Sequence, residues 1–118
     1  MKTHKDLDVW KNSIDFVTTI YKYTASFPKE ELYSLTNQVR RSAVSVPSNI
    51  AEGAGRNSYK EYIRFLYVAQ GSASELETQL IIARNLDFIS GEVFSELSES
   101  LNGIRSQLSG LIRYFRNK

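Results

Sequence analysis

The sequence predicts an all-α fold, an antiparallel up-down-up-down four-helix bundle formed by one domain over residues 1–118. Three observations predict it. Apolar residues recur at alternating steps of three and four, which keeps them on one side of a helix. Glycine, proline and capping residues divide the repeats into four segments, and none shows the period of two expected of a strand. The connections between segments are short, which places neighbouring helices antiparallel.

The first predicted helix covers about residues 6–26 and ends at Phe27-Pro28. It has two apolar stripes, about 120° apart around the helix axis. We expect the first stripe to face the bundle core: Leu7, Trp10, Ile14, Val17 and Tyr21. The second stripe is then a spare apolar face: Val9, Phe16, Ile20, Tyr23 and Phe27.

The second predicted helix covers about residues 29–54, from the turn after Pro28 to Gly53-Ala54-Gly55. Its core stripe is Leu32, Leu35, Val39, Ala43, Val46 and Ile50. Pro47 lies inside this helix, has no amide hydrogen and crowds the preceding turn, so we expect a kink there. The alternative is a helix that breaks near Ser45 and resumes after Pro47.

The third and fourth predicted helices cover about residues 59–88 and 91–116. Ser58 and Glu61 have the spacing of a capping box at the start of the third helix, and Ser90-Gly91-Glu92 separates the two helices. The expected core stripe of the third helix is Tyr62, Leu66, Ala69, Ala73, Leu76, Leu80 and Ala83. That of the fourth is Leu97, Leu101, Ile104, Leu108, Leu111 and Phe115.

Composition excludes several classes of protein. The chain has no cysteine, so it has no disulfide framework and no zinc–cysteine site, and we expect a cytoplasmic location. Its longest uncharged stretches span about ten residues, too few to cross a membrane. His4 is the single histidine and lies near the start of the chain, where we expect a frayed segment, so no His-based dyad or triad is expected within one chain. We therefore expect a protein that is not an enzyme and that uses no cofactor and no metal.

The spare apolar faces predict self-association. The third helix also has an apolar stripe offset from its core stripe, which includes Tyr59, Ile63 and Tyr67. A helix in an isolated bundle needs one apolar face, and exposed stripes of this length are typical of partner surfaces. The predicted oligomer interface consists of Val9, Phe16, Ile20, Tyr23, Ile63 and Tyr67.

The modest net charge of +2 hides an uneven distribution. With alternating helix directions, one end of the bundle collects residues 1–11, 50–64 and 105–118, which contain ten Lys or Arg, Lys2 included, and four Asp or Glu. This end, at +6, predicts phosphate binding. The expected nucleic-acid contacts are Arg56, Lys60, Arg64, Arg105, Arg113 and Arg116. Cations at the end of the last helix also favour its dipole, so a merely solvated terminus is the alternative.

Several segments are similar to one protein family. They are residues 7–10 (LDVW), 27–33 (FPKEELY), 38–53 (QVRRSAVSVPSNIAEG), 60–61 (KE), 65–66 (FL), 69–72 (AQGS) and 75–80 (ELETQL). Together they resemble the bacterial four-helix-bundle family encoded in 23S rRNA intervening sequences, which has been labelled ribosomal. Ser34 departs from the glycine common there. The matching motif includes Arg40, Arg41, Pro47, Asn49, Glu52 and Gly53.

The resemblance implies an antiparallel bundle that assembles as a ring of five subunits. It also implies a relation to the accessory variability factor of diversity-generating retroelements, a basic pentamer that works with a reverse transcriptase and RNA. Our first hypothesis is a homopentameric bundle that binds RNA or DNA through its basic end. The second is a scaffold that docks a partner protein without binding nucleic acid. The third is a small-molecule or catalytic bundle that uses residues 47–52.

Overall fold

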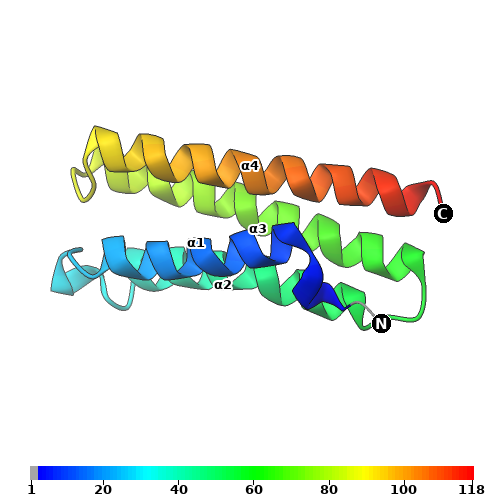
Figure 1. Ribbon diagram of the computed structural model, residues 1–118. Coiled ribbons are helices and arrows are strands. Elements are labelled where there is room, and N and C mark those ends of the chain that lie inside the picture. Colours follow the sequence, from blue (N-terminus) through cyan, green and yellow to red (C-terminus); the bar gives the residue numbers. More distant parts are fainter. Residues whose placement is uncertain (1–2) are drawn as a thin grey trace.

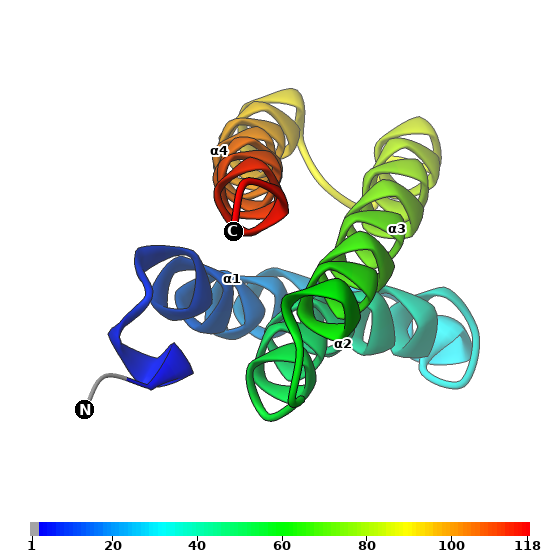
Figure 2. The same cartoon turned by 90° about the vertical axis from the view of Figure 1, so that its right-hand side faces the viewer.

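The computed structural model describes residues 3–118, and within them it has four long helices and no strand. These are α1 (Asp8–Thr24), α2 (Leu35–Ala54), α3 (Tyr59–Asn85) and α4 (Gly91–Arg116), with 3₁₀ turns at His4–Asp6 and Lys29–Glu31. Consecutive helices run antiparallel around one core, in an elongated body of 45 × 24 × 21 Å (Figures 1 and 2). The predicted all-α bundle is confirmed. Lys2 lies outside the described residues.

Four of the eight predicted helix boundaries match the structure, and the other four shift by two to six residues. The segment expected to open the second helix forms the short turn Lys29–Glu31, and α2 begins only after Ser34, whose backbone is not helical. The third helix ends at Asn85 because Asp87 takes a left-handed conformation with φ of 61°. The amides of Asp87 and Phe88 then bond the carbonyls of Arg84 and Ala83, the pattern of a Schellman motif.

The capping residues behave largely as the sequence indicates. The hydroxyl of Ser90 accepts the amide of Val93 at 3.1 Å, so it caps α4. The hydroxyl of Ser58 accepts the amide of Glu61 at 3.1 Å. Only this half of the predicted capping box forms, because the Glu61 carboxylate bonds Arg64 instead.

Helix α2 continues through Pro47, so the alternative of a break near Ser45 is wrong; the kink stays a prediction. The neighbouring polar side chains join α2 to α3. Asn49 Nδ2 donates to the carbonyl and the hydroxyl of Ser45 at 2.8 and 2.9 Å, and the Ser45 hydroxyl lies 2.7 Å from that of Ser72. The contact between α2 and α3 is the most extensive of the helix pairs.

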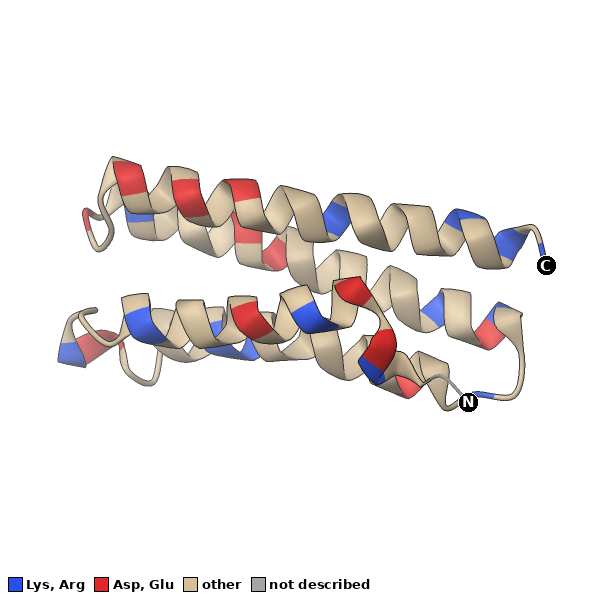
Figure 3. Cartoon of the chain, in the orientation of Figure 1, with Lys and Arg blue, Asp and Glu red and all other residues tan. Residues whose placement is uncertain are grey.

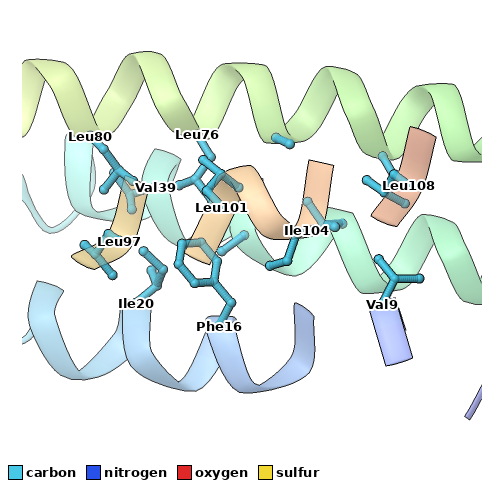
Figure 4. Close-up of a cluster of buried hydrophobic side chains, with 14 of the residues drawn as sticks. Val9, Phe16, Ile20, Val39, Leu76, Leu80, Leu97, Leu101, Ile104 and Leu108 are labelled. Atoms are coloured by element: carbon cyan, nitrogen blue, oxygen red, sulfur yellow. The ribbon is translucent and has the colours of Figure 1, made fainter. Parts of the chain in front are cut away.

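One continuous core fills the bundle, with side chains from all four helices (Figure 4). The predicted stripe of α3 is confirmed, with Tyr62 half-buried and the others buried. The predicted stripe of α2 is confirmed except at Leu32, which is exposed. The predicted stripe of α4 is confirmed except at Leu111 and Phe115, which are half-buried. Ile112 joins the core as well.

The predicted orientation of the first helix is wrong in part: Leu7, Trp10 and Val17 of the expected stripe do pack, half-buried, against the core, but the most buried side chains come from the other stripe. Val9, Phe16 and Ile20 are buried in the core, and Ile20 is fully inaccessible. Ile14 and Tyr21, expected inside, are exposed. Val9, Phe16 and Ile20 are therefore unavailable to a second copy, and this part of the predicted oligomer interface is wrong.

Two hydroxyl side chains explain the error. Ser13 and Thr24 lie on the buried face of α1 and looked polar in the sequence. Each donates its hydroxyl to a carbonyl of its own helix, Ser13 to Trp10 at 2.8 Å and Thr24 to Ile20 at 2.7 Å. A hydroxyl satisfied in this way can be buried at little cost. The true core stripe is Val9, Ser13, Phe16, Ile20 and Thr24.

Candidate nucleic-acid interface

Charge is separated along the bundle axis. The turn between α2 and α3 and the end of α4 lie at one end of the bundle, and α1 begins on the side of that end (Figure 1), as the topology predicts. We call this the basic end and define it as residues 3–11, 50–67 and 106–118; it contains eight Lys or Arg and four Asp or Glu. Helix α4 alone shows the separation, with its acidic side chains in its first half and its basic ones in its second half (Figure 3).

Arg105 is separate from the other five predicted contacts. It lies eleven residues before Arg116 on α4, roughly 16 Å along the helix axis. Its guanidinium forms an ion pair with Glu77 of α3 at 3.2 Å and donates to the Ser74 hydroxyl at 3.2 Å. Arg105 therefore joins α3 to α4 in the middle of the bundle and is not part of a surface at the basic end.

Arg56 and Arg64 lie together on the α2–α3 side. Their guanidinium groups are 4.7 and 4.4 Å from the centre of the Phe65 ring. Each also meets a carboxylate, Arg56 that of Glu52 at 3.3 Å and Arg64 that of Glu61 at 3.0 Å. The bond to Arg64 lowers the pKa of Glu61 and raises that of Arg64. These two arginines are partly neutralised by their own chain.

Helical spacing places Lys60, Arg113 and Arg116 in a different group, on the side where α3 meets α4. Arg116 donates to the Tyr67 hydroxyl, which joins the end of α4 to the third turn of α3. Lys60 and Tyr67 are seven residues apart on one stripe of α3, and Arg113 is three residues from Arg116. Among residues 3–118 no carboxylate lies within ion-pair distance of these three cations. We call Lys60, Arg113, Arg116 and Tyr67 the α3–α4 basic surface.

Aromatic side chains surround Phe115 at the same end. The ring centres of Tyr59, Tyr62 and Tyr114 lie 5.2, 4.3 and 5.4 Å from that of Phe115. Tyr62 is half-buried, and burial raises the pKa of its hydroxyl. Lys118 lies over the Tyr114 ring at 4.5 Å. The rings of Tyr59 and Tyr114 remain about half exposed.

The three remaining residues of the predicted oligomer interface are dispersed. The Tyr23 hydroxyl donates to the Glu96 carboxylate at 3.0 Å, which joins α1 to α4 and raises the pKa of Tyr23. Ile63 is half-buried against the core, and Tyr67 belongs to the α3–α4 basic surface. These side chains do not form one apolar patch.

An exposed apolar surface does exist, on the side of α1 and α2. Its members are Ile14, Tyr21, Leu32, Tyr33 and Val44, which we call the α1–α2 surface. All but Ile14 line a shallow groove of about 580 Å³, together with Asn37, Arg40, Arg41 and Ser45. The signal in the sequence is the stripe that contains Ile14 and Tyr21, which its spacing alone places in the core.

The family-motif residues have mostly structural contacts. Arg40 donates to the Thr24 hydroxyl at 2.9 Å and to the Tyr21 carbonyl at 3.4 Å, so it holds the end of α1. Gly53 is buried where α2 crosses the start of α3. Arg41 is exposed, and within residues 3–118 it forms no ion pair.

Residues 47–52, the region of the catalytic hypothesis, also have mostly structural contacts. Pro47 and Ile50 are buried, Asn49 bonds Ser45, and Glu52 pairs with Arg56. In the described part of the chain, no group of three histidine or acidic side chains is arranged to hold a metal ion. None of the helices described is both long enough and apolar enough to span a membrane.

The fold and the motif both point to known relatives. A crystal structure from Bacteroides thetaiotaomicron, described as a protein with unknown function from the S23 ribosomal protein family, superposes with a TM-score of 0.82. The two chains are 24% identical, and the match covers 89% of this chain and 95% of the other, which shows a shared fold.

No curated protein is significantly similar. The relation to the retroelement factor stays a prediction. The profile of the family described as "23S rRNA-intervening sequence protein" matches residues 5–110. The chain therefore belongs to the 23S rRNA-intervening sequence protein family, the family that its sequence resembles.

Proposed function

We propose that this protein is a cytoplasmic, non-enzymatic nucleic-acid-binding protein that contacts phosphates through the α3–α4 basic surface. One observation supports this most strongly. Lys60, Arg113 and Arg116 come from two helices to one surface and have no carboxylate partner among the described residues. A cation without a carboxylate partner can bind a phosphate and displace the counterion that was condensed on the nucleic acid there. The release of these counterions supplies much of the affinity for nucleic acid.

The helix dipole does not account for this cluster. Arg113 and Arg116 lie in the last turn of α4, where a positive charge is favourable. Lys60 lies in the first turn of α3, where a positive charge is unfavourable. A role in helix stability thus explains the two arginines but not Lys60, whereas an external anion explains all three.

The side chains available for chemistry support a non-enzymatic role. His4, the single histidine, lies in a 3₁₀ turn with its ring 5.3 Å from that of Trp10. Glu52 pairs with Arg56, and both side chains are exposed. Neither residue has a partner that would make it a general base.

Charge removal tests the proposed phosphate contacts. The triple variant Lys60→Gln, Arg113→Gln and Arg116→Gln should bind a labelled RNA at least tenfold more weakly than the wild type in fluorescence anisotropy. The control removes the same charge at the opposite end with Lys22→Gln, Lys29→Gln and Arg84→Gln, and should lose little affinity. Equal losses in the two triple variants would show that only net charge matters and would contradict the assigned surface.

Self-association is the second part of the proposal, with the pentamer implied by the resemblance as the expected state. The α1–α2 surface supports it, since five large apolar side chains are exposed along one side of the bundle. A scaffold that docks a partner protein there is the alternative function, because the groove lined by Arg40 and Arg41 suits an acidic, apolar segment.

Light scattering tests the self-association. The wild type should have several times the 13.5 kDa mass of one chain at micromolar concentration. The variant Ile14→Lys with Val44→Lys should fall to a smaller particle with unchanged helical circular dichroism. The control, Asn102→Lys with Ser106→Lys, adds the same charge at exposed positions of α4 and should keep the wild-type mass. A monomeric wild type would contradict this part of the proposal.

A further inference from the structure

The basic end presents aromatic ring faces as well as charge. Tyr59, Tyr67 and Tyr114 are 51%, 50% and 55% exposed. Tyrosine rings that only fill a core do not keep this much area in water, and their neighbours hold these rings in place. Tyr59 is stacked on Phe115 with an angle of 23° between the rings, so one face of Tyr59 is supported by the protein.

Tyr67 is held differently. Arg116 bonds its hydroxyl, and the guanidinium carbon is 5.8 Å from the ring centre. Because the guanidinium lies toward the hydroxyl edge, it fixes the ring without covering it as a close stack would. The same arginine is one of the proposed phosphate contacts. A ring face and a cation are thus adjacent on one surface.

We infer that this end binds single-stranded nucleic acid, whose unpaired bases stack on Tyr59, Tyr67 and Tyr114 while the cations contact phosphates. The inference rests on the proposed function and adds the class of nucleic acid. Alternating aromatic faces and cations are typical of single-strand binding, because every base has a face that can stack. In a duplex the bases are stacked on one another and cannot reach the rings.

The other end of the bundle also has an exposed tyrosine. Tyr33 is 91% exposed there, two residues after the turn Lys29–Glu31, and it lines the α1–α2 groove with Arg40 and Arg41. It therefore also lies near cations, but at the end of the bundle opposite to the α3–α4 basic surface. Tyr33 is thus a matched control, an exposed tyrosine on the same molecule that should not contact a nucleic acid bound at the basic end.

The experiment compares a labelled single-stranded RNA of about 20 nucleotides, longer than a typical single site, with the same strand annealed to its complement. The wild type should bind the single strand more tightly. Tyr59→Leu, Tyr67→Leu and Tyr114→Leu should each weaken single-strand binding by on the order of 5- to 100-fold, with the salt dependence unchanged. Tyr67→Phe keeps the ring and should retain most of the affinity, and Tyr33→Leu should bind as the wild type does. Circular dichroism checks that the leucine variants remain helical.

The outcomes separate stacking from the proposed function. If the three leucine variants bind the single strand as the wild type does, or if the duplex binds equally well, the stacking inference is overturned. Phosphate binding then still stands, provided that the Lys60, Arg113 and Arg116 triple variant loses affinity. If the wild type binds neither RNA, the proposed function fails and this inference fails with it.

Discussion

Replacing Ile20 with alanine should cost about 2–5 kcal/mol of unfolding free energy, whereas Ile14→Ala should cost less than about 1 kcal/mol. Ile20 is fully buried among side chains of the neighbouring helices, so its truncation leaves a cavity (Figure 4). Ile14 is 39% exposed on the same helix, and water can fill the space that its side chain leaves. The two variants remove the same atoms, so their difference reports the orientation of α1.

Urea unfolding followed by circular dichroism measures both changes at pH 7, provided that the denaturant slope is unchanged between variants. The sequence alone predicts the opposite order, since it assigns Ile14 to the core and Ile20 to the surface. A greater loss at Ile14 than at Ile20 would contradict the structure of α1. If Ile14 lies in an interface between copies, the comparison must be made at a concentration where the protein is dissociated.

Gly53→Ala should lower the unfolding free energy by about 1–2 kcal/mol, although alanine is the better helix former. A Cβ atom at Gly53 would lie 3.0 Å from Phe65 Cβ, 3.0 Å from Tyr62 Cδ1 and 3.1 Å from the Tyr62 carbonyl oxygen. The backbone of α3 cannot retreat without moving the α2–α3 turn. The clash therefore outweighs the propensity gain of about 1 kcal/mol.

Gly71→Ala is the matched control for Gly53→Ala. Gly71 lies inside α3, and an added Cβ atom would have no neighbour within 4 Å. We expect a gain of about 0.5–1 kcal/mol there, because alanine loses less backbone entropy in a helix. Urea midpoints measure both changes. A Gly53→Ala protein as stable as the wild type would show that α2 and α3 do not approach this closely.

The fold was predictable because its strongest signals are local. The three-four spacing of Leu66 to Ala83 and of Leu97 to Leu108 fixes which side of α3 and α4 faces inward. Ser58 and Ser90 mark the starts of the same helices. The end of α3 was harder to place, because no glycine marks it and Asp87 adopts the left-handed conformation in its place.

The orientation of α1 was not predictable from periodicity. Both of its stripes have helical spacing, and the choice between them depends on Ser13 and Thr24 bonding their own helix, which a hydropathy pattern cannot show. The charge at the basic end followed from topology and composition. The sequence could not show which of these cations are already paired with carboxylates. Those ion pairs depend on particular side-chain conformations: Arg56 with Glu52, Arg64 with Glu61 and Arg105 with Glu77.

The salt dependence of RNA binding tests the central claim most directly. The logarithm of the binding constant should fall linearly with the logarithm of salt concentration between about 50 and 200 mM. Each phosphate contact adds about 0.7 to this slope for a single strand, so the triple variant of Lys60, Arg113 and Arg116 should lower it by about 2. A wild-type slope that the triple variant leaves unchanged, or a wild type that binds no RNA at low salt, would contradict phosphate binding by the α3–α4 basic surface.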